Sequence, residues 1–209
     1  MFDYIRDPAE IHKRSFETVR AETDVSGLSA DEAALTVRLV HACGMPDIVR
    51  NLVFGPGALK VGRAALGEGA AILTDVEMVR HGIIRARLPA DNPVLCMLHD
   101  SGVKERAAEQ GTTRSAAAVD LWREGLEGSV VAIGNAPTAL FRLLEIIGDD
   151  VAPPAMIAAF PVGFVGAAES KEALIDFAAA KAIPFVTLKG RWGGSALAAA
   201  CVNAMGESE

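Results

Sequence analysis

Cysteine is scarce in this chain of 209 residues, which contains only Cys43, Cys96 and Cys201. Their odd number and wide separation match neither the paired spacing of a zinc site nor a redox disulfide motif. We therefore expect reduced thiols, no metal ion and a cytoplasmic location.

Positive charge and long apolar runs are also lacking. Lys and Arg number 20 against 27 Asp and Glu, giving a formal net charge of -7, and no basic stripe is present to neutralise nucleic-acid phosphates. Residues 151–168 carry no charge, but prolines and glycines interrupt them, so a membrane span is not expected. The first residues lack the apolar core of a signal peptide, so export is not expected either.

Small and aliphatic residues dominate the composition. Apolar residues make up 51% of the chain and aromatic residues only 5%, which favours close packing of helices on a sheet. Short, continuously apolar runs alternate with longer amphipathic ones, as in βα units whose sheet is covered on both faces. The predicted strands contain AAILTD, PVLCML, SVVAIG, AMIAAF and IPFVTL, and helices are predicted near 58–66, 115–126, 138–147 and 170–181.

These patterns predict a three-layer α/β/α fold with a mainly parallel, Rossmann-like sheet of about five strands in a single domain, residues 1–209. Two N-terminal helices are expected to cover the sheet. Asp7, Pro8 and Glu10 begin the first, which continues to about residue 21. A capping box of Ser29 and Glu32 begins the second, which ends at Gly44.

Loops after the predicted strands favour an anion-binding rim. Ligands of parallel sheets bind at the carboxyl ends of the strands, where GNAPT, PVGFVGAAES and KGRWGGS are expected to meet. Arg114 begins a helix, where its charge has the wrong sign for the helix dipole unless an anion is near. Lys189 and Arg191 precede a glycine-rich helix start, whose free amides suit a carboxylate. The alternative is a tight turn with solvated charges.

Arg38 and His41 lie about 60° apart on the second helix, whose other sides are largely apolar. A polar strip on such a helix must face a pocket, an interface or compensating partners. His41 is therefore a candidate acid/base group. In the alternative interpretation, His41 caps the last carbonyls of the helix and Arg38 pairs with an acid.

Other polar residues give weaker signals. Asp75 and Glu77 follow a predicted strand and suit either acid/base or helix-capping roles. Ser195 lacks the spacing of a nucleophile elbow and is interpreted as a helix cap. The remaining histidines, which form no ligand motif, are His12, His81 and His99.

Seven segments together resemble the precorrin-8X methylmutase (precorrin isomerase) family. They occur in order and span nearly the whole chain: DYIRDPAEIHKRSF, VRLVHACGMPDIV, ILTDVEMVRHGI, TTRSAAA, VVAIGNAPTALF, FPVGFVGAAESKEAL and KGRWGGSALAAA. The resemblance implies an isomerase of cobalamin biosynthesis that moves a methyl group of precorrin-8X from C-11 to C-12, forming hydrogenobyrinic acid. Because atoms only change place within one molecule, it implies no metal, nucleotide or redox cofactor.

The resemblance also implies roles for particular residues. It makes His41, in VHACG, the catalytic acid/base, and Ser15 and Arg38 substrate contacts. We extend the substrate site to Arg114 and Arg191 and to the amides of Gly193, Gly194 and Ser195, because the substrate carries several carboxylates. The family forms homodimers with sites at the subunit contact, so a homodimer is expected.

Three alternatives remain from the sequence. The first is the same methyl shift on cobalt-precorrin-8, as in the anaerobic pathway. The second is a corrinoid-binding carrier that catalyses nothing, which the presence of His41 disfavours. The third and weakest is a nucleotide-binding Rossmann-like enzyme, because the loops match neither a dinucleotide fingerprint nor a P-loop.

Overall fold

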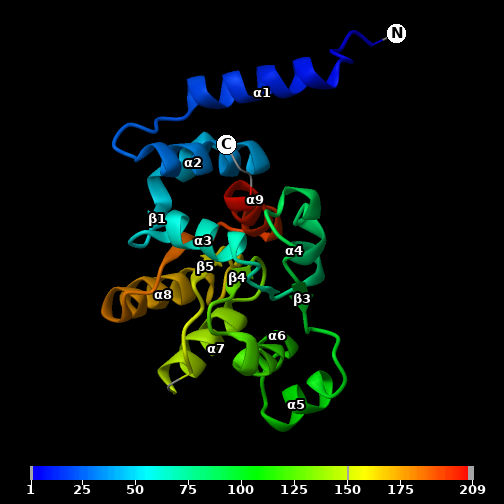
Figure 1. Ribbon diagram of the computed structural model, residues 1–209, viewed down its shortest axis with the longest axis vertical. Helices are drawn as coiled ribbons and strands as arrows, with labels where there is room; N and C mark the ends of the chain where they lie inside the picture. The colour runs from blue at the N-terminus through cyan, green and yellow to red at the C-terminus, as the bar shows by residue number, and fades with distance from the viewer. Residues whose placement is uncertain (1, 150, 207–209) are drawn as a thin grey trace.

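A six-stranded sheet lies at the centre of the computed structural model, which describes residues 2–149 and 151–206 (Figure 1). Its strand order is β1-β6-β5-β4-β2-β3, and every neighbouring pair is parallel except β1 and β6. Every residue of β2, β4, β5 and β6 is buried, which confirms the continuously apolar strands expected of a covered parallel sheet. The strands are β1 Leu52–Phe54, β2 Ile72–Thr74, β3 Val94–Cys96, β4 Val130–Ile133, β5 Met156–Ala159 and β6 Phe185–Leu188.

All five predicted strands are confirmed, and the sequence analysis missed β1. This edge strand is three residues long and only partly buried, so it lacks the signal of a buried apolar run. It runs antiparallel to β6, with Leu52 opposite Leu188. Because Leu188 ends β6, the start of β1 lies at the carboxyl rim of the parallel strands.

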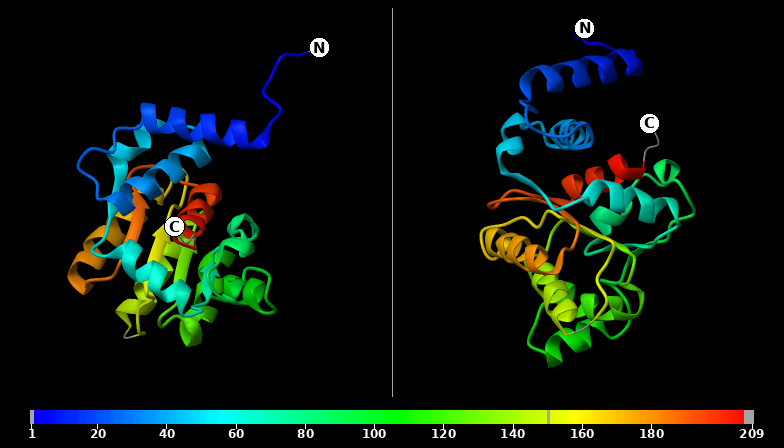
Figure 2. Two further views of the ribbon diagram at one scale, coloured as in Figure 1. Left: turned by 45° about the horizontal axis from the view of Figure 1, so that its top comes forward. Right: turned by 60° about the vertical axis from the view of Figure 1, so that its left-hand side comes forward.

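Helices cover both faces of the sheet and confirm the three-layer prediction (Figure 2). One core joins α2, α3, α4 and α9 to one face, and a second joins α7 and α8 to the other. The helices are α1 Pro8–Glu22, α2 Ala30–Cys43, α3 Ala58–Gly67, α4 Glu77–Gly82, α5 Val103–Glu109, α6 Arg114–Val119, α7 Pro137–Gly148, α8 Ala167–Lys181 and α9 Ser195–Gly206, with 3₁₀ helices η1 Pro46–Asn51, η2 Arg85–Arg87 and η3 Asp120–Gly125. The helix predicted over 115–126 is thus divided between α6 and η3.

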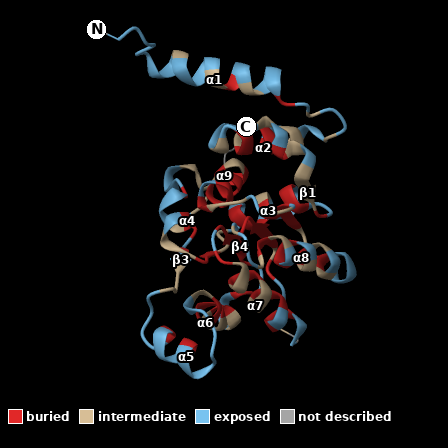
Figure 3. Ribbon diagram, turned by 180° about the vertical axis from the view of Figure 1, so that it is seen from behind, coloured by how far each residue is buried: buried red, intermediate tan, exposed pale blue. Residues whose placement is uncertain are grey.

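The two N-terminal helices differ in what they cover. Both begin as predicted, because Asp7 caps α1 and Ser29 and Glu32 form a capping box on α2. Helix α2 packs on α9, whereas α1 lies outside α2 and away from the sheet (Figures 1 and 3). Phe16 is the only residue within α1 that is buried. Helix α1 therefore extends from the body of the protein as an arm.

The carboxylate of Asp75 organises the point where the strand connections change direction. From β2 the chain passes to β3 on one side and then to β4 on the other, so β2 and β4 flank a topological switch point. Asp75 is 2% exposed and accepts N–H hydrogen bonds from Gly134, Asn135 and Ala136 at 2.9, 2.9 and 2.8 Å. Burial raises the pKa of the Asp75 carboxyl, and the three amides oppose that shift. This carboxylate is a structural support for the loop after β4.

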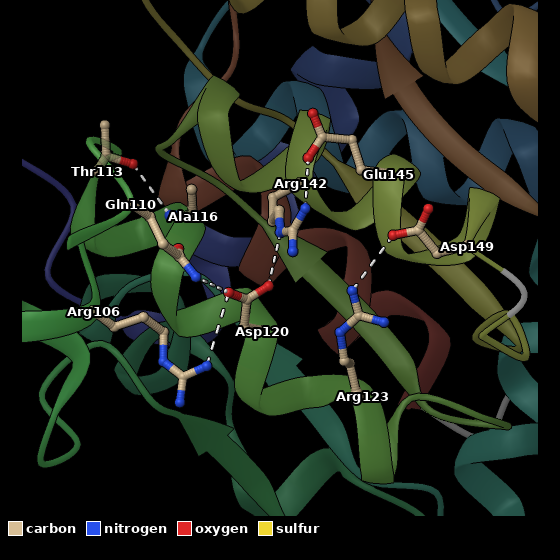
Figure 4. A network of polar contacts seen from close by, with 9 residues as sticks. All are labelled: Arg106, Gln110, Thr113, Ala116, Asp120, Arg123, Arg142, Glu145 and Asp149. Atoms are coloured by element: carbon tan, nitrogen blue, oxygen red, sulfur yellow. Dashed lines mark hydrogen bonds and ion pairs between the residues drawn. The ribbon is translucent and has the colours of Figure 1, made fainter. Parts of the chain in front are cut away.

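A second buried carboxylate, Asp120, joins three helices (Figure 4). Its side chain is 6% exposed and accepts hydrogen bonds from Arg142 Nε on α7 at 2.7 Å and from Gln110 Nε2, just after α5, at 3.1 Å. Arg106 Nη1 lies 4.0 Å away. Burial acts to raise the pKa of Asp120, but these hydrogen bonds and arginine charges outweigh it and the pKa is lowered. The network holds α5 and α6 against α7.

Replacing Asp75 with asparagine is expected to lower the free energy of unfolding by about 3 kcal/mol. Asn keeps one acceptor oxygen but turns an NH₂ group toward backbone N–H donors. Urea denaturation measures the change. Asp47→Asn is the matched control, because the carboxylate of Asp47 is exposed and pairs with the exposed Arg50; its change is expected within about 0.5 kcal/mol. Equal effects of the two substitutions would contradict the supporting role of Asp75.

Asp120→Asn is expected to cost about 2 kcal/mol at neutral pH, and this cost is expected to shrink in acid. A carboxyl whose pKa is lowered by folding stabilises the fold above its unfolded pKa of about 4, and that stabilisation disappears as pH falls through the lower folded value. Urea unfolding of the wild type and of Asp120→Asn, from neutral pH to below about pH 4, measures how the difference in free energy of unfolding changes. Asp149→Asn, at an exposed carboxylate 3.6 Å from Arg123, is expected to show little difference at any pH. A cost that stays constant below pH 4 would refute the linkage.

Candidate functional site

His41 stands in the last turn of α2, at the end of the helix that leads to the sheet rim. Gly44 ends the helix in the left-handed conformation with φ 70°, and its N–H bonds to the Val40 carbonyl at 2.7 Å. The apolar side of α2 is buried against the core, which leaves His41 exposed and Arg38 partly buried. Helix η1 then leads to β1, which starts beside the end of β6.

A hydrogen bond between α1 and α2 orients the imidazole of His41. Ser15 Oγ lies 2.9 Å from His41 Nδ1. Whichever atom donates, this bond engages Nδ1 and leaves Nε2 as the ring nitrogen that remains for a ligand. The sequence analysis placed Ser15 and His41 in one site from the family resemblance, and the structure brings them into contact.

Phe16 links Arg38 and His41 of α2. Its ring stacks on that of His41 with centroids 4.6 Å apart, and the guanidinium carbon of Arg38 lies 4.9 Å from its centroid. His12, one turn earlier on α1, places its ring 4.5 Å from Phe16 and 6.4 Å from His41. The sequence analysis missed Phe16 and treated His12 as isolated. His12 lies three residues before Ser15 and Phe16 one residue after it on the same helix. This proximity was the signal available in the sequence.

A groove of about 630 Å³ lies beside this cluster, between α1 and α2. In the lining of this groove, side chains with cationic or titratable nitrogen atoms outnumber the single carboxylate, that of Glu17. This charge balance suits an anionic ligand with apolar parts. One of these groups, Arg63, pairs with Asp31 at 2.7 Å. The polar lining residues are His12, Lys13, Glu17, Arg20, Arg38 and Arg63.

The loops after β4, β5 and β6 meet at one rim, as predicted. Val162 N–H bonds to the Asn135 carbonyl at 3.4 Å, and Gly163 N–H bonds to the Arg191 carbonyl at 3.2 Å. Lys189 N–H also bonds to the Asn51 carbonyl at 2.8 Å, which ties the loop after β6 to the segment that follows α2. We call residues 189–195 the glycine-rich loop.

Close packing fixes the backbone of the glycine-rich loop. A Cβ atom at Gly193 would lie 2.3 Å from the Phe160 carbonyl oxygen, so only glycine fits there. Gly194 has φ 125°, and its N–H bonds to the same carbonyl at 2.8 Å. That bond engages the Gly194 amide, leaving the Gly193 and Ser195 amides as the loop's candidate donors. Ser195 is the first residue of α9 rather than its cap, since the Gly194 carbonyl accepts the first bonds of the helix.

Two arginines stand at the rim on separate elements. Arg191 is exposed, with its guanidinium carbon 5.3 Å from the ring centroid of Phe164. Arg114 is exposed at the start of α6, next to Thr113, whose Oγ1 lies 2.7 Å from Thr138 Oγ1 at the start of α7. That contact places Arg114 beside the loop after β4. The dashed line to Ala116 in Figure 4 marks the cap that Thr113 provides.

The sequence-predicted residues therefore form two groups. Ser15, Arg38 and His41 are joined through Phe16, whereas Arg114 and Arg191 stand at the rim. Both groups lie within the part of the chain that the structure describes, residues 2–149 and 151–206. In the same part of the chain, no three His, Cys, Asp or Glu residues gather closely enough to hold a metal ion, and no helix is long and apolar enough to cross a membrane.

Known proteins resemble this chain over nearly its whole length. The family model described as precorrin-8X methylmutase matches residues 10–208. A Pseudomonas aeruginosa protein named precorrin-8X methylmutase is 57% identical, with 98% of each chain covered. A Salmonella typhimurium protein named cobalt-precorrin-8 methylmutase is 38% identical, covering 97% of this chain and 96% of its own. A solved structure of the Thermus thermophilus precorrin-8X methylmutase superposes with a TM-score of 0.84 at 34% identity, covering 94% of this chain and 95% of its own. The chain belongs to the precorrin-8X methylmutase family.

Proposed function

We propose that this enzyme is a precorrin-8X methylmutase of cobalamin biosynthesis, which moves the methyl group at C-11 of precorrin-8X to C-12 and forms hydrogenobyrinic acid. The observation that carries the proposal is the contact between Ser15 and His41, which presents an oriented imidazole beside a groove. The higher identity to the Pseudomonas protein than to the Salmonella protein supports the metal-free substrate over cobalt-precorrin-8.

His41 supplies the proton chemistry in this proposal. With Nδ1–H donating to Ser15 Oγ, the protonated ring of His41 donates its Nε2 proton to a ring nitrogen or to the adjoining conjugated system of the substrate and becomes a neutral imidazole. The methyl group then migrates by a 1,5-shift, and the proton returns to Nε2. Atoms and electrons balance within one molecule, so the step requires no oxidant, metal or nucleotide. Phe16 holds the imidazole plane by stacking on it.

Cationic and amide groups bind the carboxylates of the substrate. Arg38 lies in the groove next to His41, and Arg114 and Arg191 stand on the rim. The glycine-rich loop adds the amides of Gly193 and Ser195, while Gly194 supplies the turn that positions them. Arginine suits these contacts because its planar fork binds a carboxylate through two parallel hydrogen bonds.

The enzyme acts as a homodimer in this proposal, with the partner subunit completing the site. Support comes from the two groups of site residues, which stand on different elements, and from α1, which packs on α2 while apolar side chains in and just before α1 are exposed. Those exposed residues are Phe2, Tyr4 and Ile5, which precede α1, and Ile11 within it. A second copy is the natural cover for an apolar arm. We place the protein in the cytoplasm, a location that its three free cysteines suit, with no nucleic-acid or membrane partner.

His41→Ala is expected to lower the rate of conversion of precorrin-8X at least 100-fold while leaving corrinoid binding intact, because the proton donor is lost. The visible absorption spectrum follows conversion, and mass spectrometry and NMR identify the product. His81→Ala is the matched control: His81 is exposed and pairs with Glu77 away from the groove. Its activity is expected to equal that of the wild type.

Each other outcome overturns a definite part of the proposal. Equal conversion by the wild type and His41→Ala would make His41 structural. Wild-type protein that binds precorrin-8X without converting it would direct the assay to cobalt-precorrin-8, and failure on both substrates would favour a corrinoid carrier.

Ile11→Glu is expected to weaken self-association, because it puts a charge on the apolar side of α1. Sedimentation equilibrium is expected to give twice the chain mass of 21.8 kDa for the wild type and a concentration-dependent fall toward it for the variant. Ala21→Glu adds the same charge in the last turn of α1, about 15 Å along the helix from Ile11, and is expected to leave the dimer intact. A monomeric wild type, or equal effects of both substitutions, would contradict the proposed contact.

A further inference from the structure

Lys171 is a fully buried lysine to which the proposed chemistry gives no role. It lies near the start of α8, the helix that follows the loop after β5, and its side chain is 0% exposed. Lysine is almost never buried to this extent without a partner. The start of α8 is at the carboxyl rim of the sheet, because β5 runs parallel to β4 and β6.

The partner of Lys171 is a backbone carbonyl of the glycine-rich loop. Lys171 Nζ donates to the Trp192 carbonyl oxygen at 2.6 Å, and no carboxylate of a described residue pairs with it. Burial lowers the pKa of Lys171 to about 8, so the ammonium form still predominates at neutral pH. A charged donor makes this hydrogen bond stronger than one between neutral groups.

The geometry of the peptide bond extends the effect of this contact to the next amide. The Trp192 carbonyl and the Gly193 N–H belong to one peptide group, and no described peptide bond is cis, so the two point in opposite directions. Since the buried ammonium holds the carbonyl, the Gly193 N–H is directed away from Lys171. No hydrogen bond among the described residues uses this N–H. Polarisation of the carbonyl by the ammonium also makes the N–H a better donor.

Packing fixes the chain on one side of the Trp192–Gly193 peptide group but not on the other. Gly193 is confined by the Phe160 carbonyl, and Gly194 bonds to that same carbonyl, so the loop is held from β5 after Trp192. The chain before Trp192 is held more weakly: Arg191 is exposed, and its carbonyl accepts a 3.2 Å hydrogen bond from the Gly163 N–H. Lys171 therefore supplies the charged anchor in the middle of the loop.

We propose that Lys171 is a positioning residue for substrate binding: by holding the Trp192 carbonyl, it sets the Gly193 amide and Arg191 in the orientation that binds a carboxylate of the corrinoid. The inference rests on the proposed function of the glycine-rich loop. Lys171 itself does not touch the substrate and acts through the loop.

The test compares Lys171→Met with Lys181→Met, a matched control on the same helix at an exposed lysine. Lys171→Met keeps an unbranched side chain as far as Cε but removes the Nζ donor. It is expected to raise KM for precorrin-8X about tenfold with kcat changed less than about twofold, and to weaken binding of hydrogenobyrinic acid by a similar factor in calorimetry. Lys181→Met is expected to match the wild type.

A second measurement follows the loop without any corrinoid. The chain has two tryptophans, and Trp122 is 1% exposed whereas Trp192 is 46% exposed. In a Trp122→Phe background, fluorescence therefore reports Trp192 alone. Lys171→Met is expected to increase its quenching by acrylamide, because a released loop exposes the indole more often, and Lys181→Met is expected to leave quenching unchanged.

Distinct outcomes separate failure of this inference from failure of the proposed function. Unchanged quenching and unchanged KM would overturn the positioning role, as would a fall in kcat with KM unchanged, which indicates only a loss of folded enzyme. If the wild type does not convert precorrin-8X but quenching still rises, the loop anchor stands and the proposed function fails. Should Lys171→Met not fold, Lys171→Gln, whose side chain is uncharged and one atom shorter than that of lysine, replaces it with the same expected rise in KM and quenching. Failure of both to fold would make the lysine a requirement of the fold and overturn the inference.

Discussion

The carboxylate of Asp75 is the constraint on which the rim of this enzyme depends. It binds three consecutive backbone amides at the switch point between β2 and β4, and so determines the course of the loop after β4. That loop bonds to the loop after β5, which in turn bonds to the glycine-rich loop. This single buried carboxyl group thus sets the frame in which the amides and arginines of the rim are presented. Hydrogen bonds that only the folded loop supplies offset part of the cost of burying it.

The candidate site combines a helix packed into the core with a helix that buries little of its own surface. His41 ends a helix packed into the larger core, whereas Ser15 stands on an arm that buries one side chain of its own helix. Phe16 is that buried side chain, and it also contacts the rings or charges of His12, Arg38 and His41. The packing residue that holds α1 to α2 is therefore also the residue that shapes the candidate catalytic cluster.

The sequence predicted most of the sheet and the caps of the first two helices, because buried parallel strands and capping boxes have strong local signals. It missed β1, which is short and half-buried, and it did not indicate that α1 would stand apart from the sheet. The prediction that Ser15 and His41 share one site came from the family resemblance and not from their spacing in the sequence. Phe16 and Lys171 escaped notice because each acts through a contact distant in sequence: Phe16 with α2, and Lys171 with a carbonyl 21 positions later. Backbone acceptors leave no trace in the identity of the residue that carries them.

Gly193 has a consequence for how enzymes of this kind can diverge. Its backbone approaches the Phe160 carbonyl so closely that no side chain fits, so the path of the chain at this point cannot be exchanged for another. The adjacent side chains of Arg191 and Trp192 are exposed and free of such confinement. In the substrate-binding role proposed for this loop, related enzymes can therefore alter the chemical groups offered to different corrin substituents while keeping the same main-chain path. Selection for a new substrate would act on the side chains of the loop and not on its shape.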